Sequence, residues 1–290
     1  MSTKIYLPKE VNVSNIKFGD VKPMNSNGGK ILYLNYEGVN LNLQTPELNV
    51  PFDISEFKEA DKTKYVITCA LNNYNTNGDM KAFYEKLSEI DATIKKHAKE
   101  NSMAFFKKAK ISEETIDELY NPIVKFSIDK QTGEPSLRWP PNIKIKTQCK
   151  DGVFDCKMYD SKKTKFDLDG TTDNPSNIND LIVKGTRCKM LIECTGIWII
   201  NGKFGCTWKV VQARLNVATK GLDEYAFRET GDDVEFVESD EDEDEDNDND
   251  EDEDEDEDED DDDDEEEEEV VEEVKKVEPK KKVRKAKTSN

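Results

Sequence analysis

The chain has 290 residues, with 42 Lys and Arg against 65 Asp and Glu, and a formal net charge of −23. The charge is unevenly divided, because residues 1–231 carry a net charge of +4 and residues 232–290 carry −27. The first segment is long enough to bury a hydrophobic core, as one large domain or two small ones, whereas the second has almost nothing to bury. No run approaches the ~18 apolar residues of a membrane helix, and the N-terminus lacks a signal-peptide core, so neither a membrane protein nor a secreted one is expected.

The cysteines and the histidine give no pattern typical of a metal site or of catalysis. None of the six cysteines makes a Cys-x-x-Cys pair, and His97 is the only histidine. A zinc site needs four well-spaced ligands, so we expect neither a metal nor another cofactor. His97 follows two lysines in what we take to be a solvated last turn of a helix. No nucleophile, carboxylate pair or phosphate loop accompanies it, so an enzyme is not expected.

Short apolar runs broken by turn residues predict strands at Ile31–Leu34, Val39–Leu43 and Thr63–Leu71. The apolar period then becomes helical from Asp79. The residues expected on the buried face of this helix are Met80, Phe83, Leu87, Ile90 and Ile94.

A second short helix is predicted from Ser112 to the residue before Pro122, and strands then continue to about Leu215. Strands, a helical insert at about 79–120 and further strands predict a mainly β (α+β) domain with its helices grouped.

Asp151-Gly152 is a strong signal for a two-residue hairpin. In that register Lys146 lies opposite Lys157, and Lys144 lies opposite Tyr159. Like charges directly opposite each other destabilise a sheet. The face is therefore either a surface for phosphates and bases, or a solvated lysine face that guards against aggregation. Its candidate binding residues are Lys144, Lys146, Lys150, Lys157 and Tyr159.

Asn201-Gly202 marks a second hairpin, in which Trp208 is on the core face. The inward parity switches near Gly196 and again at Val210–Val211, which predicts two β-bulges. Long bent strands of this kind suit a five-stranded oligonucleotide-binding barrel, or OB-fold. The outward positions, where a tryptophan lies among cations, are Arg187, Lys189, Trp198, Lys203, Lys209 and Arg214.

Two interpretations of the tryptophans remain open. Trp198 could stack on a base between these cations, or helices could cover this face and make it a core residue. Trp139, which precedes Pro140-Pro141, is either a second exposed aromatic or a packed corner.

The C-terminal segments are defined by charge. Residues 240–269 are acidic except for Asn247 and Asn249, which predicts a disordered acidic tail at 232–274. Such a polyanion mimics a nucleic-acid backbone and could occupy the same cationic groove or recruit basic partners. The basic segment at 275–290 looks like a nuclear import signal, or else balances the acidic run by folding onto it. The residues of the candidate signal are Lys280, Lys281, Lys282, Arg284 and Lys285.

The block from Gly185 to Leu215 resembles the single-stranded DNA-binding proteins of nucleocytoplasmic large DNA viruses. It contains the segments Cys194–Trp198 and Lys203–Lys209. These are distant relatives of the short-tailed phage single-stranded DNA-binding protein. The resemblance covers roughly residues 1–231 and implies an OB-fold-like five-stranded barrel with a helical insert. It implies a protein that coats single-stranded DNA without sequence preference in viral DNA replication, recombination and repair.

The resemblance also implies that the acidic tail competes with DNA and contacts viral replication proteins such as the polymerase and the helicase-primase. It places the protein in the host nucleus or a viral replication factory, and it leaves open whether the protein is a homodimer. Phage tails of this kind end in acid and a terminal aromatic residue. This chain ends in a lysine-rich sequence and Thr288-Ser289-Asn290, so docking through a terminal aromatic is not expected.

Two other classes remain as alternatives. A nucleoplasmin-type histone chaperone also joins a β-rich core to acidic tracts and an import signal. Its core is smaller and has no long helical insert, and the lysine-lined strands of this chain would repel histones. The second alternative is a structural or interaction protein whose acidic tail only confers solubility.

Overall fold

The computed structural model describes residues 4–24, 29–76, 78–129, 131–173 and 175–218. The chain divides into two units, Met1–Ala226 and Phe227–Asn290, and all described residues belong to the first. The predicted acidic tail at 232–274 and the candidate import signal at 275–290 lie outside the described residues.

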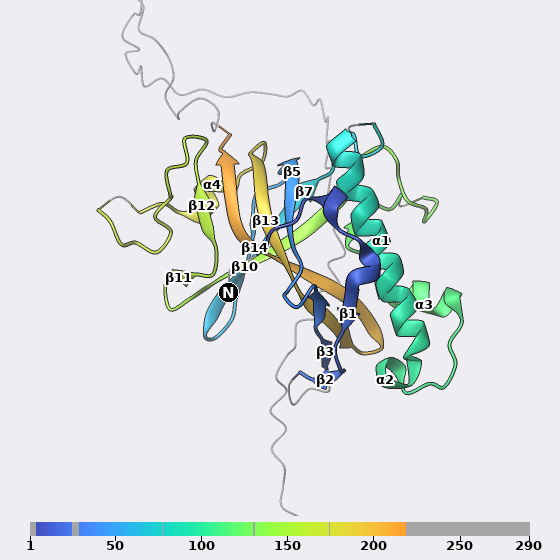
Figure 1. Ribbon diagram of the computed structural model, residues 1–290. Helices are drawn as coiled ribbons and strands as arrows, with labels where there is room; N and C mark the ends of the chain where they lie inside the picture. The colour runs from blue at the N-terminus through green and yellow to red at the C-terminus, as the bar shows by residue number, and fades with distance from the viewer. Residues whose placement is uncertain (1–3, 25–28, 77, 130, 174, 219–290) are drawn as a thin grey trace, which may run out of the picture. The chain divides into compact units, whose positions relative to one another are not determined.

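The described unit is mainly β with a few helices, an α+β fold (Figure 1). Its strands are β1 Ile16–Phe18, β2 Lys22–Pro23, β3 Lys30–Leu32, β4 Leu34–Tyr36, β5 Asn42–Asn49, β6 Ser55–Lys58, β7 Lys62–Ala70, β8 Tyr120–Asn121, β9 Val124–Lys125, β10 Asn142–Lys150, β11 Val153–Phe154, β12 Lys157–Tyr159, β13 Arg187–Ile200 and β14 Lys203–Asn216. Its α-helices are α1 Gly78–Glu100, α2 Ser102–Phe106, α3 Glu113–Leu119 and α4 Ile178–Leu181, and two 3-10 helices are η1 Pro8–Glu10 and η2 Val13–Asn15.

Five strands pair with one another in a ring. β5 pairs with β7, β7 with β10, β10 with β14, β14 with β13, and β13 again with β5. The contact between β10 and β14 is parallel and runs through Lys146 and Lys209, whereas the other four contacts are antiparallel. A single pair, Asn49 with Ala70, joins β5 to β7.

The hairpin of β13 and β14 turns at Asn201-Gly202 and has two register shifts, as predicted. One lies between Cys194 and Gly196 on β13, and the other between Leu191 and Ile192, where β14 has Val211 as its extra residue. Gly196 has a φ of +140°, and a Cβ there would lie 3.0 Å from the carbonyl oxygen of Leu32. A bulge at this position therefore requires glycine.

Helix α1 packs one face against the strands and lies along one side of them, with α2 and α3 near its C-terminal end (Figure 1). The five residues expected on its buried face are all buried, together with Ala98. In α3, the side chain of Ser112 accepts a hydrogen bond from the backbone N–H of Thr115, as an N-cap does. In the described part of the chain, no helix has both the length and the apolar character needed to cross a membrane.

Candidate nucleic-acid interface

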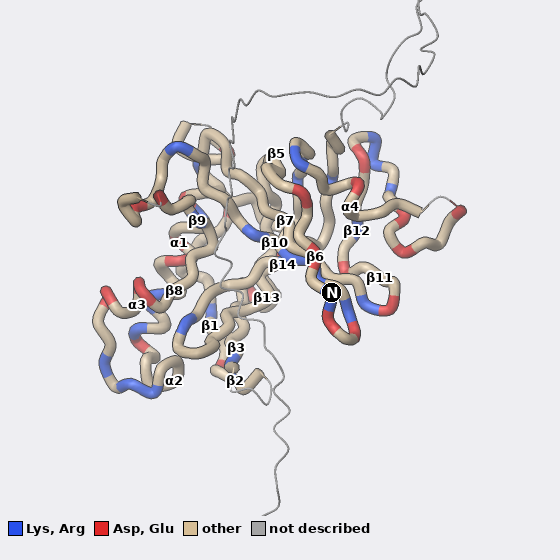
Figure 2. Tube along the Cα trace, turned by 180° about the vertical axis from the view of Figure 1, so that it is seen from behind, with Lys and Arg blue, Asp and Glu red and all other residues tan. Residues whose placement is uncertain are grey.

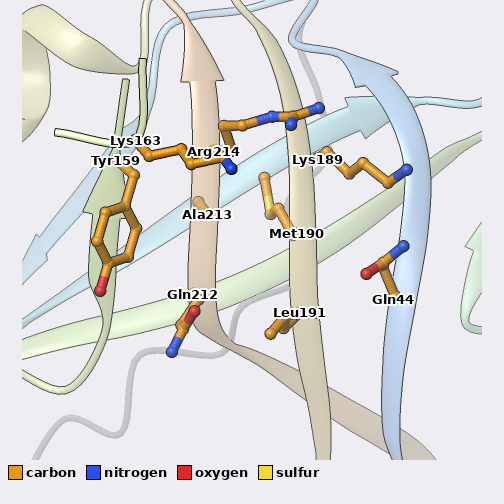
Figure 3. Close-up of a pocket in the computed structure, with 9 residues that line it drawn as sticks. All are labelled: Gln44, Tyr159, Lys163, Lys189, Met190, Leu191, Gln212, Ala213 and Arg214. Carbon is orange, nitrogen blue, oxygen red and sulfur yellow. The ribbon is translucent and has the colours of Figure 1, made fainter. Parts of the chain in front are cut away.

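A groove of about 320 Å³ lies across strands β12, β14, β13 and β5 (Figure 3). Its cations are Lys189 on β13, Arg214 on β14 and Lys163 in the turn after β12. The remaining lining residues are Gln44, Tyr159, Met190, Leu191, Gln212 and Ala213. The groove thus combines cations, one aromatic ring, two amides and an apolar floor.

The strand register explains why these side chains meet. In one row across the sheet, Tyr159 pairs with Arg214, and Arg214 pairs with Lys189. In the next row, Lys157 pairs with Gln212, Gln212 with Leu191, and Leu191 with Gln44. Residues two apart on a strand share a face, so both rows project from the same side of the sheet.

The cations of the groove form no ion pair with a carboxylate among the described residues, although the hydrogen bond and charge of Lys9, and then the charge of Lys189, lower the pKa of the Asp79 carboxyl. Lys163, Lys189 and Arg214 form no ion pair in this part of the chain, and the nearest acid in the row, Glu47 opposite Lys189, pairs instead with Arg187 at 3.4 Å. Two cations directly opposite each other repel and cost stability in a sheet. An anion bound in the groove would relieve this repulsion.

A tight turn brings Lys163 to the groove. The backbone N–H of Lys163 donates to the carbonyl of Asp160 at 3.1 Å, and the N–H of Thr164 donates to the carboxylate of Asp160 at 2.7 Å. Lys163 has a φ of +70°, in the left-handed region that non-glycine residues rarely adopt. Lys163 was not among the predicted binding residues, although the basic segment Lys162-Lys163-Thr164-Lys165 near Tyr159 indicates a cationic surface.

Strand β10 contributes a second group of cations, with Lys144, Lys146 and Lys150 all exposed. The cross-strand partners that the hairpin register predicted for Lys144 and Lys146 are wrong. Only Cys149 with Phe154 and Lys150 with Val153 pair across the Asp151-Gly152 turn. The carboxylate of Asp155 then accepts hydrogen bonds from the hydroxyl of Thr147 and the N–H of Gln148, which ends the ladder.

Beyond Asp155 the chain leaves β10, and β12 pairs in parallel with β14. Lys146 therefore lies beside Val66 and Lys209 rather than Lys157, and Lys144 lies beside Thr68 rather than Tyr159. Figure 2 shows cations on both β10 and β14 in the middle of the view.

The two groups of cations are continuous along β14. Lys146 is adjacent to Lys209, and Lys157 is adjacent to Gln212, on the same edge of this strand. Gln212 also lines the groove. The outer surface therefore carries a path from the groove past Lys157 and Lys209 to Lys146 and Lys144, which we call the cationic path.

Acidic side chains neutralise several predicted binding residues. Lys150 pairs with Asp61 at 3.1 Å, and this hydrogen bond lowers the pKa of the Asp61 carboxyl. Lys209 pairs with Glu193 at 3.4 Å. These ion pairs are partly or largely exposed, so each contributes little to stability and phosphates can replace the carboxylates.

Trp198 and Lys203 do not join the groove. Trp198 lies nine residues beyond Lys189 on β13, opposite Gly205 near the hairpin tip. It is half-buried, and a Cβ on Gly205 would lie 2.8 Å from Cζ2 of its ring. Trp198 and Lys203 therefore lie apart from Lys189 and Arg214 in the groove, because the strands are too long for one stretch to gather all six outward residues.

Among the described residues, no group of three or more His, Cys, Asp or Glu side chains could hold a metal ion. His97 is not solvated as expected, because its ring stacks on Phe18 with the centroids 4.0 Å apart. Burial lowers the pKa of its imidazole. Of the cysteines, which are all free thiols, Cys69, Cys156, Cys188 and Cys194 are buried, and Cys149 and Cys206 are partly buried.

Together these features define a mainly β domain with a cationic path and an aromatic-lined groove on its outer surface. The sequence profile of a family of unknown function (DUF5871) matches residues 69–229, more than half of the chain. The chain belongs to this family. The profile of the YL1 nuclear protein family matches residues 185–290, a region that includes the acidic run. No curated protein matches the sequence.

Two solved structures illustrate what the fold is similar to. The single-stranded DNA-binding protein from bacteriophage Enc34, in complex with single-stranded DNA, has a TM-score of 0.38 and 11% identity, with 69% of this chain and 97% of that chain covered. The protein gp2.5, a single-stranded DNA-binding protein encoded by bacteriophage T7, has a TM-score of 0.36 and 13% identity, with 64% and 98% covered. The likeness to these phage proteins is distant.

Proposed function

We propose that this protein binds single-stranded DNA with little sequence preference. The proposal rests on the groove, where Lys163, Lys189 and Arg214 form no ion pair in the described part of the chain and line the same surface as the ring of Tyr159 (Figure 3). Phosphates supply the missing negative charge, and an unpaired base can stack on the ring. The protein has no enzymatic role in this proposal.

The combination of groups favours a single strand over a duplex or an acidic protein. Bases within a duplex are stacked on one another and cannot reach a tyrosine ring, whereas those of a single strand are free to do so. An acidic peptide would use the cations but not the aromatic ring. The two amides, Gln44 and Gln212, are too few to read a base sequence, so phosphate contacts dominate the affinity.

We also propose that the ring of β5, β7, β10, β14 and β13 is an OB-fold-like barrel. In chain order β7 and β10 are its second and third strands, which in OB-folds form the oligonucleotide-binding face. Lys144 and Lys146 project from this face, at the end of the cationic path. A bound strand would then run from the groove onto β10. We take residues 1–231 as the binding domain.

The biological setting is proposed from the resemblance alone. It comprises viral DNA replication, recombination and repair, and recruitment of the polymerase and the helicase-primase by the acidic tail. The tail would also compete with DNA for the cationic path. The basic segment with Lys280, Lys281, Lys282, Arg284 and Lys285 would direct the chain to the host nucleus, which the location of a fluorescent fusion with and without this segment tests.

Fluorescence anisotropy with labelled mixed-sequence single strands tests the main proposal. We expect affinity that falls steeply as salt rises, because each phosphate contact releases counterions, and weaker binding to the duplex of the same sequence. Absence of binding at every salt concentration, or tight binding that salt does not change, would refute it. Free histones serve as the competing ligand, and preferential binding to them would favour the chaperone alternative.

A further inference from the structure

Trp139 is the most exposed of the three tryptophans. Its side chain is 59% exposed, whereas Trp198 is half-buried and Trp208 is 1% exposed. Leaving an indole in water forfeits the gain of about 1.5–3 kcal/mol that burial of a large apolar side chain provides. The prolines after Trp139 therefore do not make a packed corner, and the exposed ring needs another explanation.

The ring is held by a rigid backbone. A residue before proline is restricted to extended conformations, and Trp139 precedes Pro140 and Pro141. The carbonyl of Pro141 accepts a hydrogen bond from the N–H of Leu71 at 2.9 Å, which fixes the segment to the end of β7. An exposed ring on a fixed backbone loses little conformational entropy when it binds a ligand.

A cation lies over the ring. The guanidinium carbon of Arg138 is 5.2 Å from the ring centroid of Trp139, within the range of a cation–π interaction. An arginine in this position can hold a phosphate while the exposed part of the indole meets the adjoining base.

The position of Trp139 connects it to the cationic path. Strand β10 begins at Asn142, only three residues later, and its exposed lysines Lys144 and Lys146 follow. Lys144 and Lys146 share one face of β10, about 7 Å apart, and the exposed ring of Trp139 precedes them on the segment that leads into this strand.

We propose that Trp139, with Arg138 over its ring, is a base-stacking platform at the β10 end of the cationic path, and that its ligand is a nucleobase of a single strand. The inference rests on the proposed single-stranded DNA binding and extends it to a loop outside the groove. Charge favours this occupant over an apolar protein surface, because Arg138, Lys144 and Lys146 would meet phosphates on either side of the stacked base.

The test compares three variants of the full chain, Trp139→Ala, Trp139→Phe and Leu137→Ala. Leu137 is 78% exposed and lies two residues away, so its variant removes apolar surface from the same loop without removing a ring. Two labelled probes of equal length are used, an oligothymidylate and an abasic strand that keeps the phosphates without bases. All three variants should melt like the wild type, since both side chains are exposed.

With the oligothymidylate, Trp139→Ala should bind roughly 5- to 150-fold more weakly, the range for loss of one base-stacking contact. Trp139→Phe should keep most of the affinity, and Leu137→Ala all of it. The wild type and Trp139→Ala should bind the abasic strand with equal affinity, because this strand has no base to stack on the ring. Equal affinity of the wild type and Trp139→Ala for the oligothymidylate would refute the proposed base-stacking role and point to a protein-docking loop. Equal losses of affinity in Trp139→Ala and Leu137→Ala would refute this role as well. Failure of the wild type to bind either probe would instead overturn the proposed function.

Discussion

Lys189 on β13 and Arg214 on β14 lie directly opposite each other in the antiparallel register, and both line the groove. Like charges in such a pair destabilise a sheet by up to ~1 kcal/mol. Neither side chain forms an ion pair among the described residues, and the carboxyl of Asp79, whose pKa is lowered mainly by Lys9, interacts with Lys189 only through its charge. A fold selected for stability alone would place an acid at one of these positions, as it does with Glu193 opposite Lys209 on the same two strands.

The double variant Lys189→Gln/Arg214→Gln should therefore weaken binding of single-stranded DNA while leaving the fold as stable or slightly more stable. Loss of two phosphate contacts should also flatten the dependence of log affinity on log salt by about 1.4, because each contact to a single strand contributes about 0.7. Anisotropy titrations at several salt concentrations and thermal melting measure the two effects.

The matched control is Lys96→Gln/Lys108→Gln, which changes the net charge equally at two exposed positions on α1 and after α2. If the control loses as much affinity as the groove variant, the effect is one of net charge, and the groove is not the binding site.

A second prediction concerns Asp91 on α1. Its carboxylate accepts hydrogen bonds from the hydroxyl of Tyr120 and the N–H of Ile123, and it joins the helix to the segment around β8. Burial raises the pKa of Asp91 to about 6, although these hydrogen bonds and the charge of Lys95 act in the opposite direction. The folded state thus binds a proton more tightly than the unfolded state, so the contribution of Asp91 to stability is complete at low pH and is lost as the pH rises through about 6.

Relative to Asp91→Asn, the wild type should therefore lose stability between about pH 4 and pH 7, by an amount on the order of 2–3 kcal/mol. Urea unfolding of both proteins across this range measures the difference. His97 titrates in both proteins, so its effect cancels. A difference that stays constant with pH would show that the pKa of Asp91 is not raised.

A third prediction concerns Trp208, which is 1% exposed, and whose indole N–H has no hydrogen-bond partner among the described residues. Trp208→Ala should destabilise the domain by ~3–5 kcal/mol, the usual cost of truncating an aromatic residue in a core. Trp208→Phe should cost clearly less, because it keeps most of the apolar volume and removes an unsatisfied buried donor.

Chemical denaturation of both variants decides this point. Equal losses for Trp208→Phe and Trp208→Ala would mean that the N–H has a partner, such as an ordered water, whose hydrogen bond matters.

The sequence predicted those parts of the fold that local patterns control. The turn at Asn201-Gly202, both bulges and the buried position of Trp208 follow from side-chain parity and turn chemistry within one continuous hairpin. The helical face of α1 follows from its period in the same way.

Long-range pairing was not predictable from these patterns. Lys157 has the correct outward parity, but its strand pairs with β14 instead of β10, because Asp155 ends the hairpin ladder with side-chain hydrogen bonds. The inward and outward alternation of side chains likewise does not predict that the ring of Trp198 lies over Gly205, close to Asn121. Only some residues of the groove were predicted from the sequence. Gln44 was not among them, because it lies on β5, which is far from β13 in the sequence but pairs with it.

The last prediction concerns residues 232–290, whose removal should tighten binding of single-stranded DNA, most strongly at low salt. A tethered polyanion has a high local concentration near the cationic path, so DNA must displace it. Removal also changes the net charge from −23 to +4 over residues 1–231, which abolishes the long-range repulsion of DNA. Salt screens both effects, with a Debye length of about 8–10 Å near physiological ionic strength, so the gain should shrink as salt increases.

A shorter truncation, of residues 275–290 alone, separates the acidic run from the basic segment that follows it. It should weaken binding, because the lysines of that segment either shield the acidic run or contact DNA themselves. The affinities of the full chain and of both truncations at two salt concentrations provide the comparison. Should the chain without residues 232–290 bind DNA no better than the full chain at low salt, the acidic run does not compete for the cationic path.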